Sequence, residues 1–107
     1  MYAYTMHIPA PIEAYEAMHK AVLEVMEEEG AGAGDGLLLH LAYATDEGFD
    51  LTEVWESKEQ LDAFNEDVFS KAMTRSGISM DGPAPEPVEF VPAGLVLPRA
   101  FTLDAVT

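Results

Sequence analysis

Residues 49–60, Phe-Asp-Leu-Thr-Glu-Val-Trp-Glu-Ser-Lys-Glu-Gln, pass directly from a strand pattern to the start of a helix. The part that ends at Trp55, the single tryptophan of the chain, is apolar and β-prone. Ser57 can then accept a hydrogen bond from an unpaired backbone N–H, and Gln60 can reach back to the serine N–H. A large amphipathic ring therefore lies where a strand meets a helix, either on the wall of a cleft or inside the core.

A hairpin is predicted just before this junction. Residues 37–44 form another β-prone run, and the short glycine-containing turn at residues 45–48 joins it to the first run. If residues 45 and 48 lie opposite each other, His40 faces Glu53 on the side of the sheet that carries Trp55. A shift of one residue would move His40 to the other face.

The remaining segments complete a β-α-β-β-α-β order. Apolar residues recur at three- and four-residue steps in the predicted helices, and β-prone runs lie between turn residues. This order predicts an α+β, ferredoxin-like domain in which a four-stranded antiparallel sheet carries two helices on one face. The predicted elements are a strand over 2–8, a helix over 12–29, strands over 37–44 and 49–56, a helix from about 58 to about 75 that stops at Gly77, and a strand over 88–91.

The second predicted strand is apolar on both faces. In residues 37–42, Leu-Leu-Leu-His-Leu-Ala, odd positions point to one face and even positions to the other, and His40 is the only polar residue. A strand covered on one face only would be polar on the other. We therefore predict a homodimer in which sheet packs on sheet. Residues 1–92 form the domain, and residues 93–107 form an apolar extension that can cover this face or cross to the partner.

The composition restricts the class of protein. The 107 residues suffice for one domain with one core. The net charge of −15 repels phosphate backbones and anionic lipid, so neither nucleic acid nor a membrane is an expected partner. The chain has no cysteine, which removes disulfides, thiolate metal sites and cysteine nucleophiles. No stretch approaches the apolar length of a membrane span, so a cytoplasmic protein is expected.

Neither a metal site nor a cofactor motif is predicted. The three histidines are far apart in the sequence, and none belongs to an H-x-x-x-H or H-x-E pattern. The glycine-rich residues 30–36 follow a helix and lack the Gly-Lys-Ser/Thr ending of a phosphate loop.

His40 and Glu53 are the candidate catalytic residues. A buried imidazole without a partner costs about 1–3 kcal/mol, and Glu53 would supply the partner. Glu53 would fix the tautomer of His40, and the free ring nitrogen would accept a proton from a phenol or an acidic C–H. The alternatives are a histidine satisfied at the dimer interface and a glutamate that only stabilises the sheet.

Further candidates line a pocket for a small apolar or aromatic molecule. Tyr15 and His19 lie one turn apart beside the apolar stripe of the first helix, where they either reach a cleft above the sheet or border the stripe. Trp55 either holds a ligand ring or fills the core. The candidate pocket residues are Trp55, Leu51, Phe64, Tyr15, His19 and His7.

Three stretches of the chain are informative together: residues 36–42, the Glu53-x-Trp55-x-Ser57 pattern and Leu-Asp-Ala-Phe at residues 61–64. They resemble the antibiotic biosynthesis monooxygenase-like domains of the dimeric α+β barrel superfamily. The resemblance covers roughly the first ninety residues by order of elements. It implies a dimer with a small-molecule pocket between sheet and helices in each subunit. It also implies oxidation of aromatic polyketides or quinols without metal or flavin, while relatives degrade haem or cyclise polyketide chains.

The sequence departs from that family at three positions. Leu51 stands where the cofactor-free oxygenases often have asparagine, and Phe64 where quinol- and haem-acting relatives often have histidine. On the first strand, His7 is the nearest polar residue to the asparagine of the haem-degrading members. Haem ligation is therefore not expected, and fold alone does not carry function. Two hypotheses follow: a cofactor-independent monooxygenase or cyclase for aromatic or polyketide-like molecules, and a non-catalytic dimeric ligand-binding or accessory module.

Overall fold

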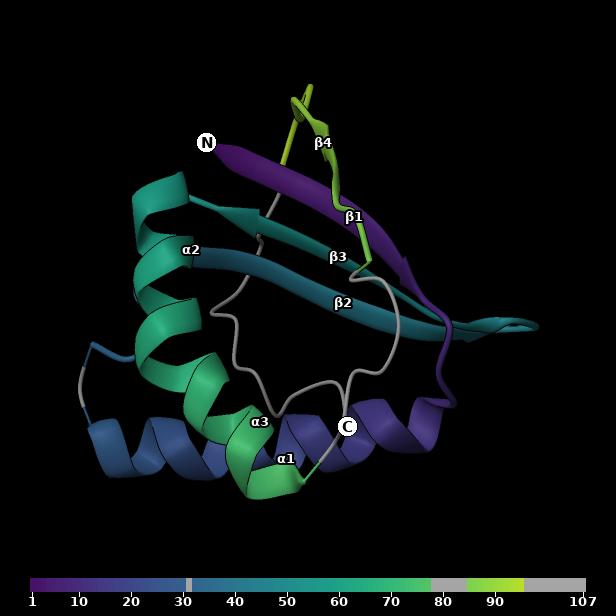
Figure 1. The fold of residues 1–107 in the computed structure, drawn as a ribbon. Coiled ribbons are helices and arrows are strands. Elements are labelled where there is room, and N and C mark those ends of the chain that lie inside the picture. The colour runs from purple at the N-terminus through teal and green to yellow at the C-terminus, as the bar shows by residue number, and fades with distance from the viewer. Residues whose placement is uncertain (31, 78–84, 96–107) are drawn as a thin grey trace.

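The computed structural model describes residues 1–30, 32–77 and 85–95. Within these residues the chain is an α+β domain whose four antiparallel strands follow the order β2-β3-β1-β4, with the helices on one face of the sheet (Figure 1). The predicted class and the antiparallel sheet are confirmed, and the order is compatible with a ferredoxin-like fold. The elements are β1 (Tyr2–Ile8), α1 (Ile12–Glu29), β2 (Leu37–Thr45), β3 (Gly48–Trp55), α2 (Lys58–Phe64), the π-helical turn η1 (Asn65–Phe69), α3 (Ser70–Ser76) and β4 (Val88–Phe90).

The hairpin of β2 and β3 has the register expected from its turn. Thr45 pairs with Gly48, and His40 consequently pairs with Glu53. Gly48 is required here, because a Cβ atom at this position would lie 2.2 Å from the backbone oxygen of Ile8. The close approach of β1 therefore helps to hold the register that places His40 opposite Glu53.

One residue of β2 breaks the alternation of faces. Leu37 pairs with Trp55 and Leu39 with Val54, so Leu38 is an extra residue on β2, a β-bulge. Leu37 consequently packs with the cluster around Trp55 on the helix side. Strict alternation placed Leu37 on the same face as Leu39, and that expectation is wrong because of the bulge.

The helical run after β3 has the predicted extent but not a uniform pitch. The Ser57 hydroxyl oxygen accepts the backbone N–H of Gln60 at 3.2 Å, which confirms the predicted cap. The Gln60 side chain does not take its expected role at the serine N–H, because its Oε1 accepts the Ser57 hydroxyl at 2.9 Å. Residues 65–69 form a π-helical turn inside the run, and Gly77, with φ 70°, ends it in the left-handed conformation.

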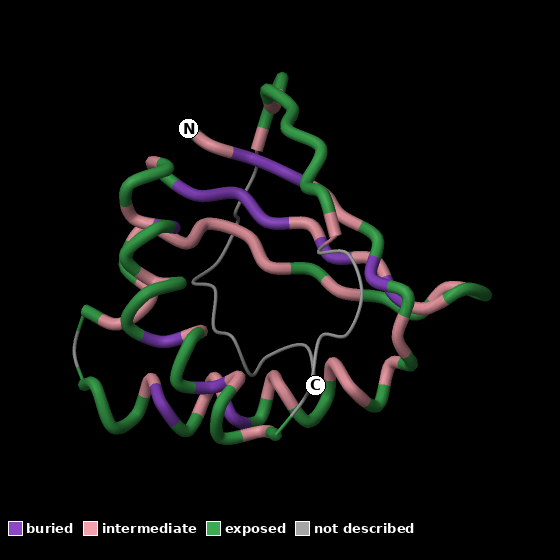
Figure 2. The backbone as a smooth tube through the Cα atoms, in the orientation of Figure 1, coloured by how far each residue is buried: buried purple, intermediate pink, exposed green. Residues whose placement is uncertain are grey.

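Buried residues form three clusters, two on the inner face of the sheet and one between the helices (Figure 2). Outside the cluster between the helices, Lys71 pairs with Glu29 and Arg75 with Glu28, which joins α3 to the end of α1. The clusters are Ala21, Val25, Val68 and Ala72 between the helices, then Tyr4, Trp55 and Leu61, and finally Ile8, Phe49 and Leu51.

The C-terminal predictions are tested only in part. β4 ends at Phe90, one residue before its expected end. Of the predicted extension over 93–107, residues 96–107 lie outside the described residues. None of the helices in the described ranges is both long and apolar enough to cross a membrane.

Candidate functional site

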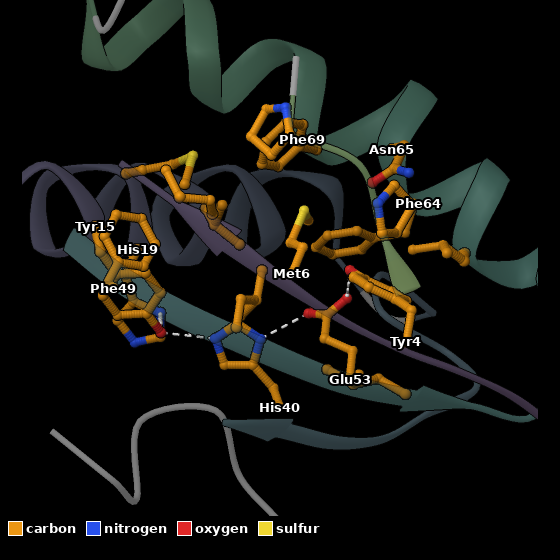
Figure 3. Close-up of a pocket in the computed structure, with 18 of the residues that line it drawn as sticks. Tyr4, Met6, Tyr15, His19, His40, Phe49, Glu53, Phe64, Asn65 and Phe69 are labelled. Carbon is orange, nitrogen blue, oxygen red and sulfur yellow. Dashed lines mark hydrogen bonds and ion pairs between the residues drawn. The ribbon is translucent and has the colours of Figure 1, made fainter. Parts of the chain in front are cut away.

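A cavity of about 730 Å³ lies between the sheet and the helices, a volume typical of small-molecule sites. Inner-face residues of β1, β2 and β3 form one wall, and residues of α1, α2 and η1 form the other. Most of the lining is apolar. Among the polar side chains that line it, a group from β1, α1, β2 and β3 lies close together (Figure 3): Tyr4, Tyr15, His19, His40 and Glu53. The lining also includes the polar residues Tyr2, Lys58, Asp62 and Asn65.

A continuous hydrogen-bonded chain links three of these side chains. His40 Nδ1 lies 2.6 Å from Glu53 Oε2, and His40 Nε2 lies 2.6 Å from the Tyr15 hydroxyl (Figure 3). The hairpin register brings the first pair together across two strands, and α1 lays Tyr15 over the sheet. The His40 side chain is 14% exposed, so the pair lies on the cavity wall and not on the outer surface.

Glu53 is the anchor of this chain. Glu53 is 6% exposed, and its carboxylate also accepts the Tyr4 hydroxyl at 2.5 Å and the Trp55 indole N–H at 3.0 Å. Burial acts to raise the pKa of Glu53, but hydrogen bonds from His40, Tyr4 and Trp55 outweigh it and hold the pKa below its ordinary value. Glu53 is therefore ionised at neutral pH, and the Glu-x-Trp pattern has a physical reason, because residues two apart share one face of a strand.

The two tyrosines act as donors. Burial, with the nearby Glu53 charge, raises the pKa of Tyr15 to about 12, and the same causes raise the pKa of Tyr4. Both hydroxyls therefore keep their protons at neutral pH. The Tyr15 hydroxyl also lies 3.3 Å from His19 Nδ1, and the rings of Tyr15, His19 and His40 are stacked with centroids 5.4–6.0 Å apart.

These three rings separate two cavities. A second cavity of about 780 Å³ lies along α1 and the edge strand β2, and Tyr15, His19 and His40 belong to the linings of both. The ring stack is therefore the thin part of the wall around the inner cavity.

Six of the eight residues predicted for the site line the inner cavity: His40, Glu53, Leu51, Phe64, Tyr15 and His19. Trp55 does not, because it is 0% exposed, with its ring against Phe64 at 5.3 Å. His7 is also misplaced by the prediction. It lies on the opposite face of β1 and pairs with Asp50 at 2.7 Å.

Tyr4 and Asn65 line the cavity although the sequence did not single them out as site residues. Tyr4 pairs with Glu53 across β1 and β3, so the register of those two strands, had it been known, would have identified it. Asn65 and Phe69 are the first and last residues of η1, and both line the cavity. No sequence signal marks a π-helical turn.

Chemically, this arrangement could serve as a general base. An ionised carboxylate orients an imidazole, and the second imidazole nitrogen meets a hydroxyl on the wall of an apolar cavity. Within the described part of the chain, no group of three or more His, Cys, Asp or Glu side chains could hold a metal ion.

Comparisons of the sequence with protein-family models and with curated proteins found no match. The resemblance to the monooxygenase-like domains therefore stays a prediction.

Proposed function

We propose that the domain is a cofactor-independent enzyme for an aromatic or polyketide-like molecule, and that its chemistry begins with removal of a proton from a phenol or an acidic C–H. The observation that carries the proposal is the Glu53–His40–Tyr15 chain on the wall of a mostly apolar cavity. A buried ionised carboxylate costs free energy to desolvate. Hydrophobic residues of similar volume would often give a fold that is equally stable or more stable. The position of this carboxylate at a cavity supports a role in proton transfer.

The lining favours a neutral, largely aromatic ligand. Met6, Leu51, Phe64 and Phe69 supply apolar surface on both walls, where a planar ring system can pack. The charge of Glu53 disfavours a ligand that arrives as an anion. A neutral phenol or ketone that loses its proton only after binding fits both conditions.

Removal of a proton leads to either reaction of the predicted class. In oxygenation of a methylene group between aromatic rings, the carbanion gives electrons to O₂. The carbon gains one oxygen atom as a ketone, and the other oxygen leaves as water with the two hydrogens of the methylene group. In cyclisation, the carbanion attacks a carbonyl carbon of the same chain and no oxidant is needed. The role of His40 and Glu53 is the same in both.

Oxygen uptake with dithranol, a dihydroxyanthrone, tests the proposal. We expect the protein to accelerate oxidation of dithranol to the anthraquinone, and His40→Gln to lower the rate by roughly 100-fold or more. The matched control is His7→Gln, which removes a histidine from the opposite face of the sheet and should leave the rate unchanged. An unchanged rate in His40→Gln would refute the proposed role of the pair.

The second candidate is a non-catalytic ligand-binding or accessory module. It is favoured by the Tyr15 hydroxyl, which occupies the His40 nitrogen that a substrate would need. This candidate predicts that a neutral probe such as naphthol quenches the Trp55 fluorescence equally in the wild type and in His40→Gln. It also predicts that neither protein accelerates dithranol oxidation.

We also propose that the outer face of the sheet packs on the same face of a second copy, as in a dimeric α+β barrel. This face carries large apolar side chains that are well exposed in the single chain, at 43% for Leu41, 49% for Tyr43, 63% for Val88 and 41% for Phe90. Such a patch supports a protein interface. Sedimentation equilibrium should give a dimer for the wild type and a monomer for Leu41→Glu, whereas a monomeric wild type would refute the dimer.

A further inference from the structure

The direction of each hydrogen bond in the chain follows from the ionised state of Glu53. A carboxylate has no proton to donate, so His40 Nδ1 must carry the hydrogen of the 2.6 Å bond to Glu53 Oε2. In the neutral imidazole the other nitrogen, Nε2, then holds a lone pair. The Tyr15 hydroxyl at 2.6 Å must donate to it. Every donor therefore points toward Glu53.

This direction has a consequence for the reacting proton. The lone pair of His40 Nε2 already accepts the hydrogen bond from the Tyr15 hydroxyl. A ligand therefore cannot bond to His40 Nε2 while the Tyr15–His40 hydrogen bond persists. The Tyr15 oxygen keeps lone pairs of its own, and Tyr15 lies on the cavity wall. A ligand hydroxyl or acidic C–H that meets this wall can therefore donate to the Tyr15 oxygen.

We propose that Tyr15 is the catalytic residue that takes the ligand proton, acting as a relay to His40; this inference rests on the proposed function. The ligand O–H or C–H bond breaks and its proton goes to the Tyr15 oxygen. At the same time the Tyr15 O–H bond breaks and that proton goes to His40 Nε2. The products are a ligand anion, a neutral Tyr15 and an imidazolium paired with the Glu53 carboxylate, and no electron is transferred.

A relay suits this tyrosine better than a preformed phenolate. Burial and the Glu53 charge raise the pKa of Tyr15 to about 12, so only roughly 10⁻⁵ of it would be ionised at neutral pH. In the relay the hydroxyl proton leaves only as the ligand proton arrives, and no separate phenolate forms. The stacked rings of His19 and His40 hold the Tyr15 ring in the position that this exchange needs.

The rival arrangement is a cap. In that case a ligand hydroxyl displaces Tyr15 and bonds directly to His40 Nε2. The two arrangements make opposite predictions for Tyr15→Phe, which keeps the stacked ring and removes only the hydroxyl. If Tyr15 is a relay, the substitution stops proton transfer, because a gap remains between the ligand and the His40 imidazole. If Tyr15 is a cap, the substitution removes the cap, and His40 becomes more accessible to the ligand.

The test uses para-nitrophenol, whose anion absorbs visible light, at a pH just below the pKa of the free probe. We expect the wild-type protein to bind the probe and convert it to phenolate, and both Tyr15→Phe and His40→Gln to give roughly tenfold less phenolate per bound probe. Binding is measured separately by equilibrium dialysis. His7→Gln is the matched control, since His7 lies on the opposite face of β1 and pairs with Asp50. Thermal unfolding checks that each variant is folded.

The possible outcomes separate the relay from the proposed function. Phenolate that is lost in His40→Gln but kept or increased in Tyr15→Phe would overturn the relay and leave the base in place. Phenolate that persists in His40→Gln, or that does not form in the wild type, would overturn both. Dithranol oxidation gives a second measurement, in which the relay requires Tyr15→Phe to lose about as much activity as His40→Gln.

Discussion

The helices of this domain pack closely against each other but leave space where they face the sheet. Between α1 and the run of η1 and α3, Val25 and Val68 are each 1% exposed and Ala72 is 0% exposed, so small apolar side chains close the interface. Between the helices and the sheet a cavity of about 730 Å³ remains, with an ionised carboxylate on its wall. The closed interface serves stability, and the open one provides a place for a ligand.

Glu53→Leu is expected to have the largest effect on stability. It leaves donors on His40, Tyr4 and Trp55 without their acceptor, and breaking a buried pair in this way costs about 3–5 kcal/mol. Urea unfolding followed by Trp55 fluorescence measures the loss. Glu53→Gln is the matched variant and should lose less, because its amide oxygen still accepts hydrogen bonds. A Glu53→Leu protein as stable as the wild type would show that the polar chain is dispensable to the fold.

Substitution of two valines on α1 tests the difference between the helix–helix interface and the helix–sheet interface. Val25 is fully buried between the helices, whereas Val22 lies on the cavity wall. Val25→Ala should lower the free energy of unfolding by about 2 kcal/mol, from lost burial and the new void. Val22→Ala should lower it by less than about 1 kcal/mol, because Val22 is only partly buried: it packs against the edge of the helix cluster and also borders the cavity, so less buried surface is lost. Equal losses, measured by urea unfolding, would mean that the cavity wall is as tightly packed as the core.

The features of the fold that could be predicted depend on short sequence patterns. The Ser57 cap, the turn at residues 45–48 and the stop at Gly77 each act through neighbouring residues, so the elements were predictable. The His40–Glu53 pairing followed only on the condition that residues 45 and 48 lie opposite each other, and the structure supplies that register. The bulge at Leu38 and the π-helical turn at residues 65–69 depend on how whole elements fit together, and no short pattern encodes them.

The same limit applies to the candidate site. His40 and Glu53 were found because an ionisable residue in an apolar strand is uncommon and needs a partner. The donor role of Tyr4 required the register between β1 and β3, which are separated by a helix and a strand in the sequence. Trp55 was predicted for the pocket but does not line it. The pattern around Trp55 located the end of the strand, but its ring is buried and not on the cavity wall.

The smallest expected effect is on the pH dependence of stability. The folded pKa of Glu53 lies below its ordinary value of 4.5, so its contribution is fully present above that pH and is lost as the pH falls through the folded pKa. Each unit by which the pKa is lowered corresponds to about 1.4 kcal/mol. Glu53→Gln lacks this titration, so its stability deficit relative to the wild type should shrink as the pH falls below about 4.5.

Urea unfolding of both proteins at each pH measures this deficit, and the difference between them removes the contribution of the other 19 of the 20 acidic residues. The sequence pI of about 4.1 calls for dilute protein in this range. A deficit that grows on acidification would mean that the folded pKa of Glu53 is raised and that burial outweighs its hydrogen bonds. If the pKa were raised as far as neutral pH, the carboxyl would be partly protonated there. His40 would lose the anionic acceptor from which the direction of the relay follows.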